Sequence, residues 1–151
     1  MKSIIAIFLM FLVLVGICFA AEELIKPKEL TTTEVQLYVD WNAVVVEADK
    51  ATEAKEYDKA SELYIKYSDI GDKLNRMDLK AWGLNNAGYM LIKKHAGDKW
   101  EAKDLFKDDY EKAKKLLNKC IETKGAKEET IKKAKKNIKH INERLGIDED
   151  K

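Results

Sequence analysis

The residue types that most often do chemistry in proteins are few in this chain, and their spacing does not favour a reactive site. His95 and His140 are the only histidines, and neither has a second His or Cys at helical spacing, as a metal centre would need. We therefore expect no metal site and place both histidines on the solvated surface. The stretch "DKWEAKDLFKDD" is rich in acids but lacks the glycine that a calcium-binding EF-hand loop requires.

The candidate nucleophiles also lack a setting that would activate them. Ser61 and Ser68 fall in a predicted helix with no sharp turn to expose them. Cys120 falls on an apolar stripe, where an inert core residue is the simpler interpretation. Neighbouring acids such as Asp108 and Asp109 are typical of helix starts, where the helix dipole favours negative charge. The sequence predicts no catalytic residue and no cofactor, so we expect a protein that is not an enzyme.

The first twenty residues are unlike the rest of the chain. One Lys precedes an unbroken apolar run over residues 4–15, and the small residues Cys18 and Ala20 lie just before Ala21. The run is shorter than the ~20 apolar residues of a membrane span, and the pattern is typical of a cleaved secretory signal. We expect an exported protein, periplasmic or secreted. A lipid anchor on Cys18 is the alternative, although Ile17 is bulky for the position before a lipidated cysteine.

Composition then narrows the fold. Without residues 1–20 the chain keeps 131 residues, enough for one compact domain, and its acids and bases balance at 27 each because Lys2 is lost from 28. Such a balance argues against a nucleic-acid-binding protein. Cys120 would be the only remaining cysteine, so no internal disulfide can form. One proline, few glycines, many helix-forming residues and no period-two alternation predict an all-α fold.

Apolar residues recur at helical spacing in five segments. Thr33 is expected to cap the first helix with Gln36 in a capping box, Gly71 to end or bend the second, and Gly146 to cap the last. Residues 96–108, with Leu105 and Phe106 among them, fit either a short helix or a packed loop. The expected helices run over Glu34–Ala54, from about Glu56 to Gly71, and over Met77–Lys94, Asp109–Thr123 and Lys127–Leu145.

Two of these segments share a pattern, "YDKASELYIKY" and "YEKAKKLLNKC". The positions that correspond are Tyr57, Ala60 and Tyr64 in the first and Tyr110, Ala113, Leu117 and Cys120 in the second. Together with the small residues of "LNNAGYML", they resemble the tetratricopeptide repeat. The resemblance covers roughly Glu34–Thr123, and its spacing exceeds the ~34-residue period of that family. It implies antiparallel helix pairs in a right-handed superhelix of about two repeats plus a C-terminal capping helix. A bundle of four or five helices is the alternative.

These features divide the chain into four segments. We expect a signal peptide over residues 1–20, a leader over 21–32, a tetratricopeptide-like helical domain over 33–146 and an acidic tail over 147–151.

The resemblance also implies a concave groove lined by the first helix of each pair. The residues placed in it are Trp82, Asn85, Tyr89 and Ile92 from the third helix and Val45 and Asp49 from the first. Aromatic rings, an amide and an acid suit capture of a peptide or helix of an envelope protein. In this family the grooves that bind a C-terminal carboxylate use basic residues. Val45 and Asp49 are not basic, so we do not expect this chain to recognise a C-terminal carboxylate. For each aromatic residue, Trp82 above all, core packing is the alternative.

Two other functions stay open. A closed cavity lined by Tyr64, Tyr67 and Trp82 would instead favour a helical bundle that binds a small ligand. The basic C-terminal helices could contact an anionic membrane through Lys132, Lys133 and Lys136, although a solvated capping face explains these lysines more simply. Two repeats are few for a stack of this kind, so we expect either burial by the insertion from Trp100 to Phe106 and the last helix or pairing of the protein with itself, as a homodimer.

Overall fold

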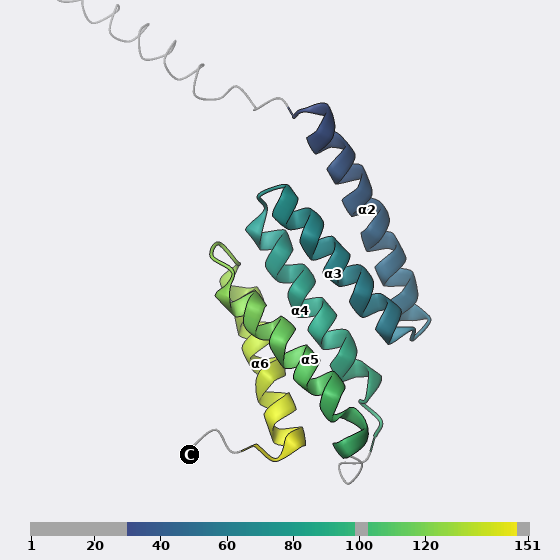
Figure 1. Ribbon diagram of the computed structural model, residues 1–151, viewed down its shortest axis with the longest axis vertical. Helices are drawn as coiled ribbons and strands as arrows, with labels where there is room; N and C mark the ends of the chain where they lie inside the picture. The colour runs from purple at the N-terminus through teal and green to yellow at the C-terminus, as the bar shows by residue number, and fades with distance from the viewer. Residues whose placement is uncertain (1–29, 99–102, 148–151) are drawn as a thin grey trace, which may run out of the picture. The chain divides into compact units, whose positions relative to one another are not determined.

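The computed structural model describes residues 30–98 and 103–147 (Figure 1). Over these two ranges the chain is helical and contains no strand, which confirms the predicted all-α class. The predicted signal peptide, Cys18, nearly all of the leader, Trp100, Ala102 and residues 148–151 of the tail lie outside the described residues. The helices are α2 (Thr32–Glu53), α3 (Tyr57–Lys73), α4 (Met77–Lys94), α5 (Lys103–Glu122) and α6 (Glu128–Leu145).

The helices pack largely in the order in which they follow one another in the chain. α2 contacts α3, α3 contacts α4, and α4 contacts α5, while α6 packs against both α5 and α4 (Figure 1). The turns after α2 and α3 each reverse the chain within three residues through one left-handed residue, Lys55 with φ 61° and Asn75 with φ 54°. Such short turns produce antiparallel neighbours. α4 is consequently the central helix, with three others around it.

The predicted apolar stripes form one main core between the helices. Its largest fully buried side chains include Tyr110, Phe106, Leu91 and Leu117. Six alanines lie between the packed helices, and their side chains are completely buried. These are Ala48, Ala60, Ala81, Ala87, Ala113 and Ala134. A second, smaller cluster of Val44, Tyr67 and Ile70 packs between α2 and α3.

Two predicted helix boundaries are wrong for identifiable reasons. Thr33 lies inside α2, which begins at Thr32, and the Gln36 amide donates to Asp40 Oδ1 at 2.9 Å instead of closing a capping box. Gly71 lies buried inside α3, which continues to Lys73. A Cβ on Gly71 would stand 2.8 Å from the backbone nitrogen of Lys80. This glycine therefore permits a close approach of α4 and does not end the helix.

The segment that fitted either a helix or a loop extends α5 toward its N-terminus. α5 begins at Lys103, almost two turns before the predicted start at Asp109. Phe106 is fully buried, with its ring centroid 4.8 Å from that of Tyr110, whereas the neighbouring Leu105 is 78% exposed. Packing of Phe106 explains why the helix starts early. At the other end of the domain Gly146 adopts φ 69° and caps α6, as predicted.

Candidate functional site

The four α4 residues predicted to face a groove divide into two exposed and two buried side chains. Trp82 and Tyr89 are 38% and 41% exposed, whereas Asn85 and Ile92 are 5% and 6% exposed. Ile92 belongs to the main core. The expectation of an exposed Ile92 is therefore wrong, because α4 has α3, α5 and α6 around it and only a narrow part of its surface reaches solvent.

Trp82 packs against aromatic residues of α3. Its ring centroid lies 5.0 Å from that of Tyr67 and 5.6 Å from that of Tyr64, and the ring of Trp41 in α2 lies 5.4 Å from Tyr67. Each of the four rings packs against at least one of the others. Tyr64, Tyr67 and Trp82 therefore form one cluster of aromatic rings in contact. Core packing, the alternative considered for Trp82, matches these contacts.

The two groove residues predicted in α2 face α3. Val45 is half-buried against the cluster that contains Tyr67. Asp49 is exposed, and its Oδ1 accepts a hydrogen bond of 2.9 Å from the Tyr64 hydroxyl. Burial first, and then that hydrogen bond, raise the pKa of Tyr64. Val45 and Asp49 thus join α2 to α3 and do not lie with Tyr89.

A hollow between α4 and α6 brings Asn85 and Tyr89 together with residues that the sequence did not associate with them. Its volume is about 380 Å³. From α4 it is lined by Asn85, Asn86 and Tyr89, and from α6 by Lys133, Lys136 and Asn137. We call this hollow the α4–α6 groove.

Two side-chain amides connect the walls of the α4–α6 groove. Asn137 Nδ2 donates to Asn85 Oδ1 at 3.3 Å, and Asn85 is almost completely buried. No acceptor for the Asn85 Nδ2 group is found among the described residues. An amide that has used its oxygen still offers two N–H donors. The base of the groove can therefore donate hydrogen bonds to a carbonyl or carboxylate oxygen.

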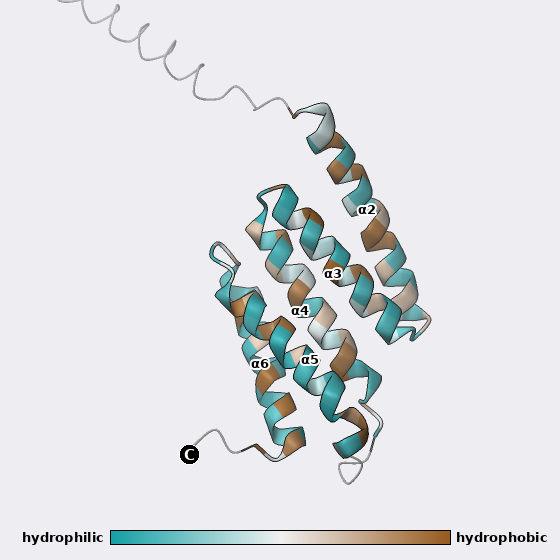
Figure 2. Cartoon of the chain, in the orientation of Figure 1, coloured by the Kyte–Doolittle hydropathy of each residue, from teal (hydrophilic) through white to brown (hydrophobic). Residues whose placement is uncertain are grey.

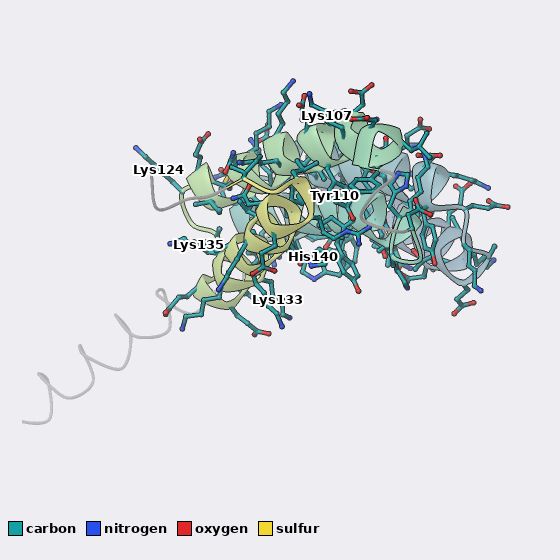
Figure 3. All side chains as sticks on the ribbon, turned by 90° about the horizontal axis from the view of Figure 1, so that it is seen from below. Lys107, Tyr110, Lys124, Lys133, Lys135 and His140 are labelled. Atoms are coloured by element: carbon teal, nitrogen blue, oxygen red, sulfur yellow. The ribbon has the colours of Figure 1, made fainter. Side chains whose placement is uncertain are left out.

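The two lysines make the groove positively charged. Lys133 pairs with Glu129 at 2.7 Å, but both side chains are well exposed and such surface pairs stabilise little. Within the described ranges Lys136 forms no ion pair. Figure 3 shows Lys133 and Lys135 extending from α6. An anion entering the α4–α6 groove would meet one unpaired ammonium group and one weakly paired group.

Sequence reasoning placed Lys133 and Lys136 in a different role and missed Asn137. The sequence assigned these lysines to a solvated capping face or to membrane contact, because nothing in it shows that α6 packs against α4. The sequence did contain a usable signal. Lys136 and Asn137 follow Lys133 by three and four residues, so the three side chains share one side of a helix. That signal gives a shared face but not the neighbour that the face meets.

His95 is the clearest correction among the candidate reactive residues. It was predicted on the solvated surface, yet it is only 8% exposed at the end of α4. Nδ1 lies 2.7 Å from Asp98 Oδ2, and Nε2 lies 2.8 Å from Asp109 Oδ2. Lys94 adds ion pairs of 3.0 Å to Asp109 and 2.9 Å to Asp58. The histidine is buried because α5 begins early and carries Asp109 over it. His140 is exposed, as predicted.

This charged network ties the ends of three helices together. Burial acts to raise the pKa of Asp109, but the hydrogen bonds and charges of His95 and Lys94 outweigh it and leave that pKa below its usual value. Each nitrogen of His95 already faces a carboxylate oxygen. In residues 30–98 and 103–147 no group of three His, Cys, Asp or Glu side chains is placed to hold a metal ion. The network therefore acts as a structural clamp, which joins the ends of α3, α4 and α5.

Cys120 is fully buried, as its place on an apolar stripe predicted. Desolvation raises the pKa of its thiol to about 11. A thiol with such a pKa is almost entirely protonated at neutral pH and is a poor nucleophile.

A larger hollow of about 650 Å³ lies near the turn between α3 and α4 and the end of α5. Its charged residues are of both signs, and one pair is already joined, since Lys80 Nζ contacts Asp72 Oδ1 at 2.8 Å. It therefore shows no preference for a cationic or an anionic ligand. The other charged residues that line it are Asp69, Lys119, Glu122 and Lys124.

No helix in the described part of the chain is long and apolar enough to cross a membrane. Compared with protein-family models, curated proteins and solved structures, the chain matches none. Its function must therefore be inferred from the residues of the α4–α6 groove themselves.

Proposed function

We propose that this protein is a non-catalytic binding module that holds an acidic peptide segment of a partner protein in the α4–α6 groove. One arrangement carries the proposal. Lys136, which has no ion-pair partner among the described residues, lines the same hollow as the exposed ring of Tyr89 and the amide pair of Asn85 and Asn137.

Each part of the groove fits one feature of a peptide. The lysine ammonium attracts an acidic side chain, and the exposed Tyr89 ring offers apolar contact area with little conformational entropy to lose. The amides can donate to backbone carbonyl oxygens, which every peptide carries. A hollow of about 380 Å³ has room for a few residues and not for a whole helix. The groove therefore favours a short segment over a folded partner surface.

Affinity capture from an envelope extract of the source organism tests this proposal. We would compare the native protein with Tyr89→Ala and Lys136→Glu, and use Lys135→Glu as a matched control, because Lys135 is exposed on α6 but does not line the groove. A fluorescent glutamate-rich octapeptide would give a defined probe alongside the capture. We expect Tyr89→Ala and Lys136→Glu to lose the captured protein and weaken the probe about tenfold, as for a hot-spot residue.

The Lys135→Glu control distinguishes binding in the α4–α6 groove from non-specific attraction between the basic helix α6 and an acidic ligand. Retention of binding by this variant, with loss in Lys136→Glu, would support the groove. Equal loss in both lysine variants would reject it and leave only attraction between a basic helix and an acidic probe.

We also propose that the pairs α2–α3 and α4–α5 are two copies of one tetratricopeptide-like unit. Ala60 and Ala113 support this equivalence because both are completely buried, and Tyr64 and Leu117, four residues later, are also core residues. An experimental structure tests it by superposition of the two pairs. A best fit that places Ala60 on any residue other than Ala113 would reject the repeat and favour an ordinary helical bundle.

Export to the cell envelope is a further proposal, based on the apolar segment before Ala21. Mass measurement of the protein isolated from fractionated cells tests it. A mass that corresponds to residues 21–151 in the envelope fraction would support cleavage after Ala20. A chain beginning at Cys18 with an added acyl mass would replace that proposal with a lipid anchor.

The exposed lysines of α6 favour a second candidate function, contact with an anionic membrane. Lys132 and Lys133 are 73% and 63% exposed, although each pairs with a glutamate one turn earlier, which reduces their charge. Sedimentation with vesicles that contain phosphatidylserine tests this candidate. Binding that disappears at high salt and survives Tyr89→Ala would favour the membrane over the groove.

A further inference from the structure

α2 exposes a narrow apolar stripe to solvent. Val35, Val39 and Val46 are 48%, 56% and 46% exposed. At about 100° per residue the three side chains fall within roughly 40° of one another around the helix axis. Figure 2 shows brown segments recurring along α2.

This stripe lies on the side of α2 opposite to its core contacts. The residues that α2 buries are Val44, Ala48 and Ala51, and their mean direction is roughly 180° from that of the exposed valines. α2 is therefore apolar on two opposite faces, of which α3 covers only one. The exposed valines are not part of the packing of the domain.

The helix at the other end of the array is different. α6 directs lysines into solvent, among them Lys132, Lys135 and Lys139, which are all exposed. A helical array needs a polar outer face at each end to remain soluble and separate. α6 has such a face, whereas the outer face of α2 carries three exposed valines among its polar residues, so the valine stripe is a surface that a partner would cover.

The spacing of the stripe fits a second helix. Val35, Val39, Asn42 and Val46 follow one another at intervals of four, three and four, the pattern of a coiled-coil seam. The residues that flank the seam carry no charge over its central part. They are Gln36, Tyr38, Ala43 and Val45. A second helix with the same seam could therefore approach without repulsion between like charges.

We propose that the partner is a second copy of this chain and that the two α2 helices pair antiparallel. In the register that brings the seams together, Val35 meets Val46 of the second copy, and Val39 meets Asn42 of the second copy. Asp49 then lies beside Thr32 of the second copy, in the first turn of that helix. The helix dipole favours a carboxylate near a helix N-terminus.

Charge selects this direction over the parallel one. In a parallel pair Asp49 would face Asp49 of the second copy, and Glu53 would face Glu53, so like charges would repel. The antiparallel pair replaces that repulsion with attraction to a helix N-terminus. The result is a closed dimer with a twofold axis near the middle of α2. The α4–α6 groove lies on other helices, so the dimer is independent of the proposed peptide site.

Disulfide cross-linking of the full chain tests the register. Two differently tagged copies would be co-expressed, one with Val39→Cys and one with Asn42→Cys, both with Cys18→Ser to remove the other accessible thiol. Facing seam positions lie within the distance that a disulfide spans. We expect the mixed pair to form at least about ten times more cross-linked product than Val39→Cys alone, in which the two cysteines face each other only in a parallel pair.

Sedimentation equilibrium provides a second, independent measurement. A chain beginning at Ala21 suffices, because every core residue lies within the compact unit Thr32–Lys151. We expect a dimer whose dissociation constant rises at least about tenfold in Val39→Glu and is unchanged in Lys135→Glu. Val39 is more than half exposed, so this variant should fold, and circular dichroism would verify it. A monomer at all concentrations, or preferential linkage of Val39→Cys to itself, would overturn the proposal.

Discussion

His95 Nε2 lies 2.8 Å from Asp109 Oδ2 and thereby joins the end of α4 to the second turn of α5. The other ring nitrogen lies 2.7 Å from Asp98 Oδ2. The imidazole therefore lies between two carboxylates, one from the turn after α4 and one from α5. These contacts join the end of α4 to α5, and their partners can be changed one at a time.

Replacement of His95 by alanine should destabilise the protein by about 2 kcal/mol, because it removes a buried side chain and takes one of its partners from the half-buried Asp109 carboxylate. The measurement is the midpoint of urea unfolding, followed by circular dichroism. His140→Ala is the matched control, since His140 is exposed and should change stability by less than about 0.5 kcal/mol. Equal effects of the two variants would show that His95 is not a structural clamp.

Asp109 should make stability depend on pH on the acid side. Its folded pKa is lowered, whereas the unfolded chain restores the ordinary value near 3.8, so the unfolded state takes up protons first as pH falls. The stabilisation is therefore complete above the ordinary pKa and is lost as pH falls through the folded pKa. Asp109→Asn should remove this component of the acid dependence in unfolding curves measured from about pH 6 down to about pH 2. An equal change in Asp108→Asn, a substitution at an exposed neighbour, would contradict the assignment to Asp109.

Gly83→Ala should destabilise the protein by at least about 2 kcal/mol, despite the better helix propensity of alanine. The added Cβ would stand 2.8 Å from the backbone oxygen of Tyr64 and 2.8 Å from a ring carbon of Tyr67. Neither atom is the end of a flexible side chain, so α3 and α4 would have to separate. Gly97→Ala serves as the control, because among the described residues, apart from its chain neighbours, no atom lies within 4 Å of its Cβ position. Thermal unfolding that shifts equally in both variants would contradict this close approach.

Cys120 should resist thiol reagents in the folded protein. With a pKa of about 11, roughly one thiol in a thousand is ionised at pH 8, and the side chain is fully buried. A Cys18→Ser chain treated with a chromogenic disulfide reagent should react only on the time scale of unfolding and rapidly in urea. Rapid reaction under native conditions would show that α5 opens around Cys120.

Much of the architecture could be predicted from the sequence, because helix periodicity is a local property. The buried stripes of α3, α5 and α6 and the left-handed cap at Gly146 follow from residues within a few turns of one another. Gly71 shows the limit of such reasoning. A glycine near a predicted helix end is usually a stop, and only the position of α4 reveals that this one accommodates a neighbouring backbone.

The candidate site differs from the groove that the sequence predicted. The sequence assigned Tyr89 and Asn85 to a groove lined by the first helix of each pair, whereas in the structure they line a hollow between α4 and α6. Ile92 shares their helix but is buried, and the opposite wall of the groove comes from α6. Periodicity shows which residues share a face, but it does not show how many other helices surround that face.

The sequence by itself determined the helical class, most helix boundaries and the side of each helix that is apolar. These depend on backbone propensity and on the spacing of side chains along one helix. Only the tertiary structure decided which faces meet: His95 between two carboxylates, Lys136 beside Tyr89, and the valines of α2 left uncovered. The physical reason is that such contacts join residues far apart in the chain, and their distances are set by the packing of whole helices.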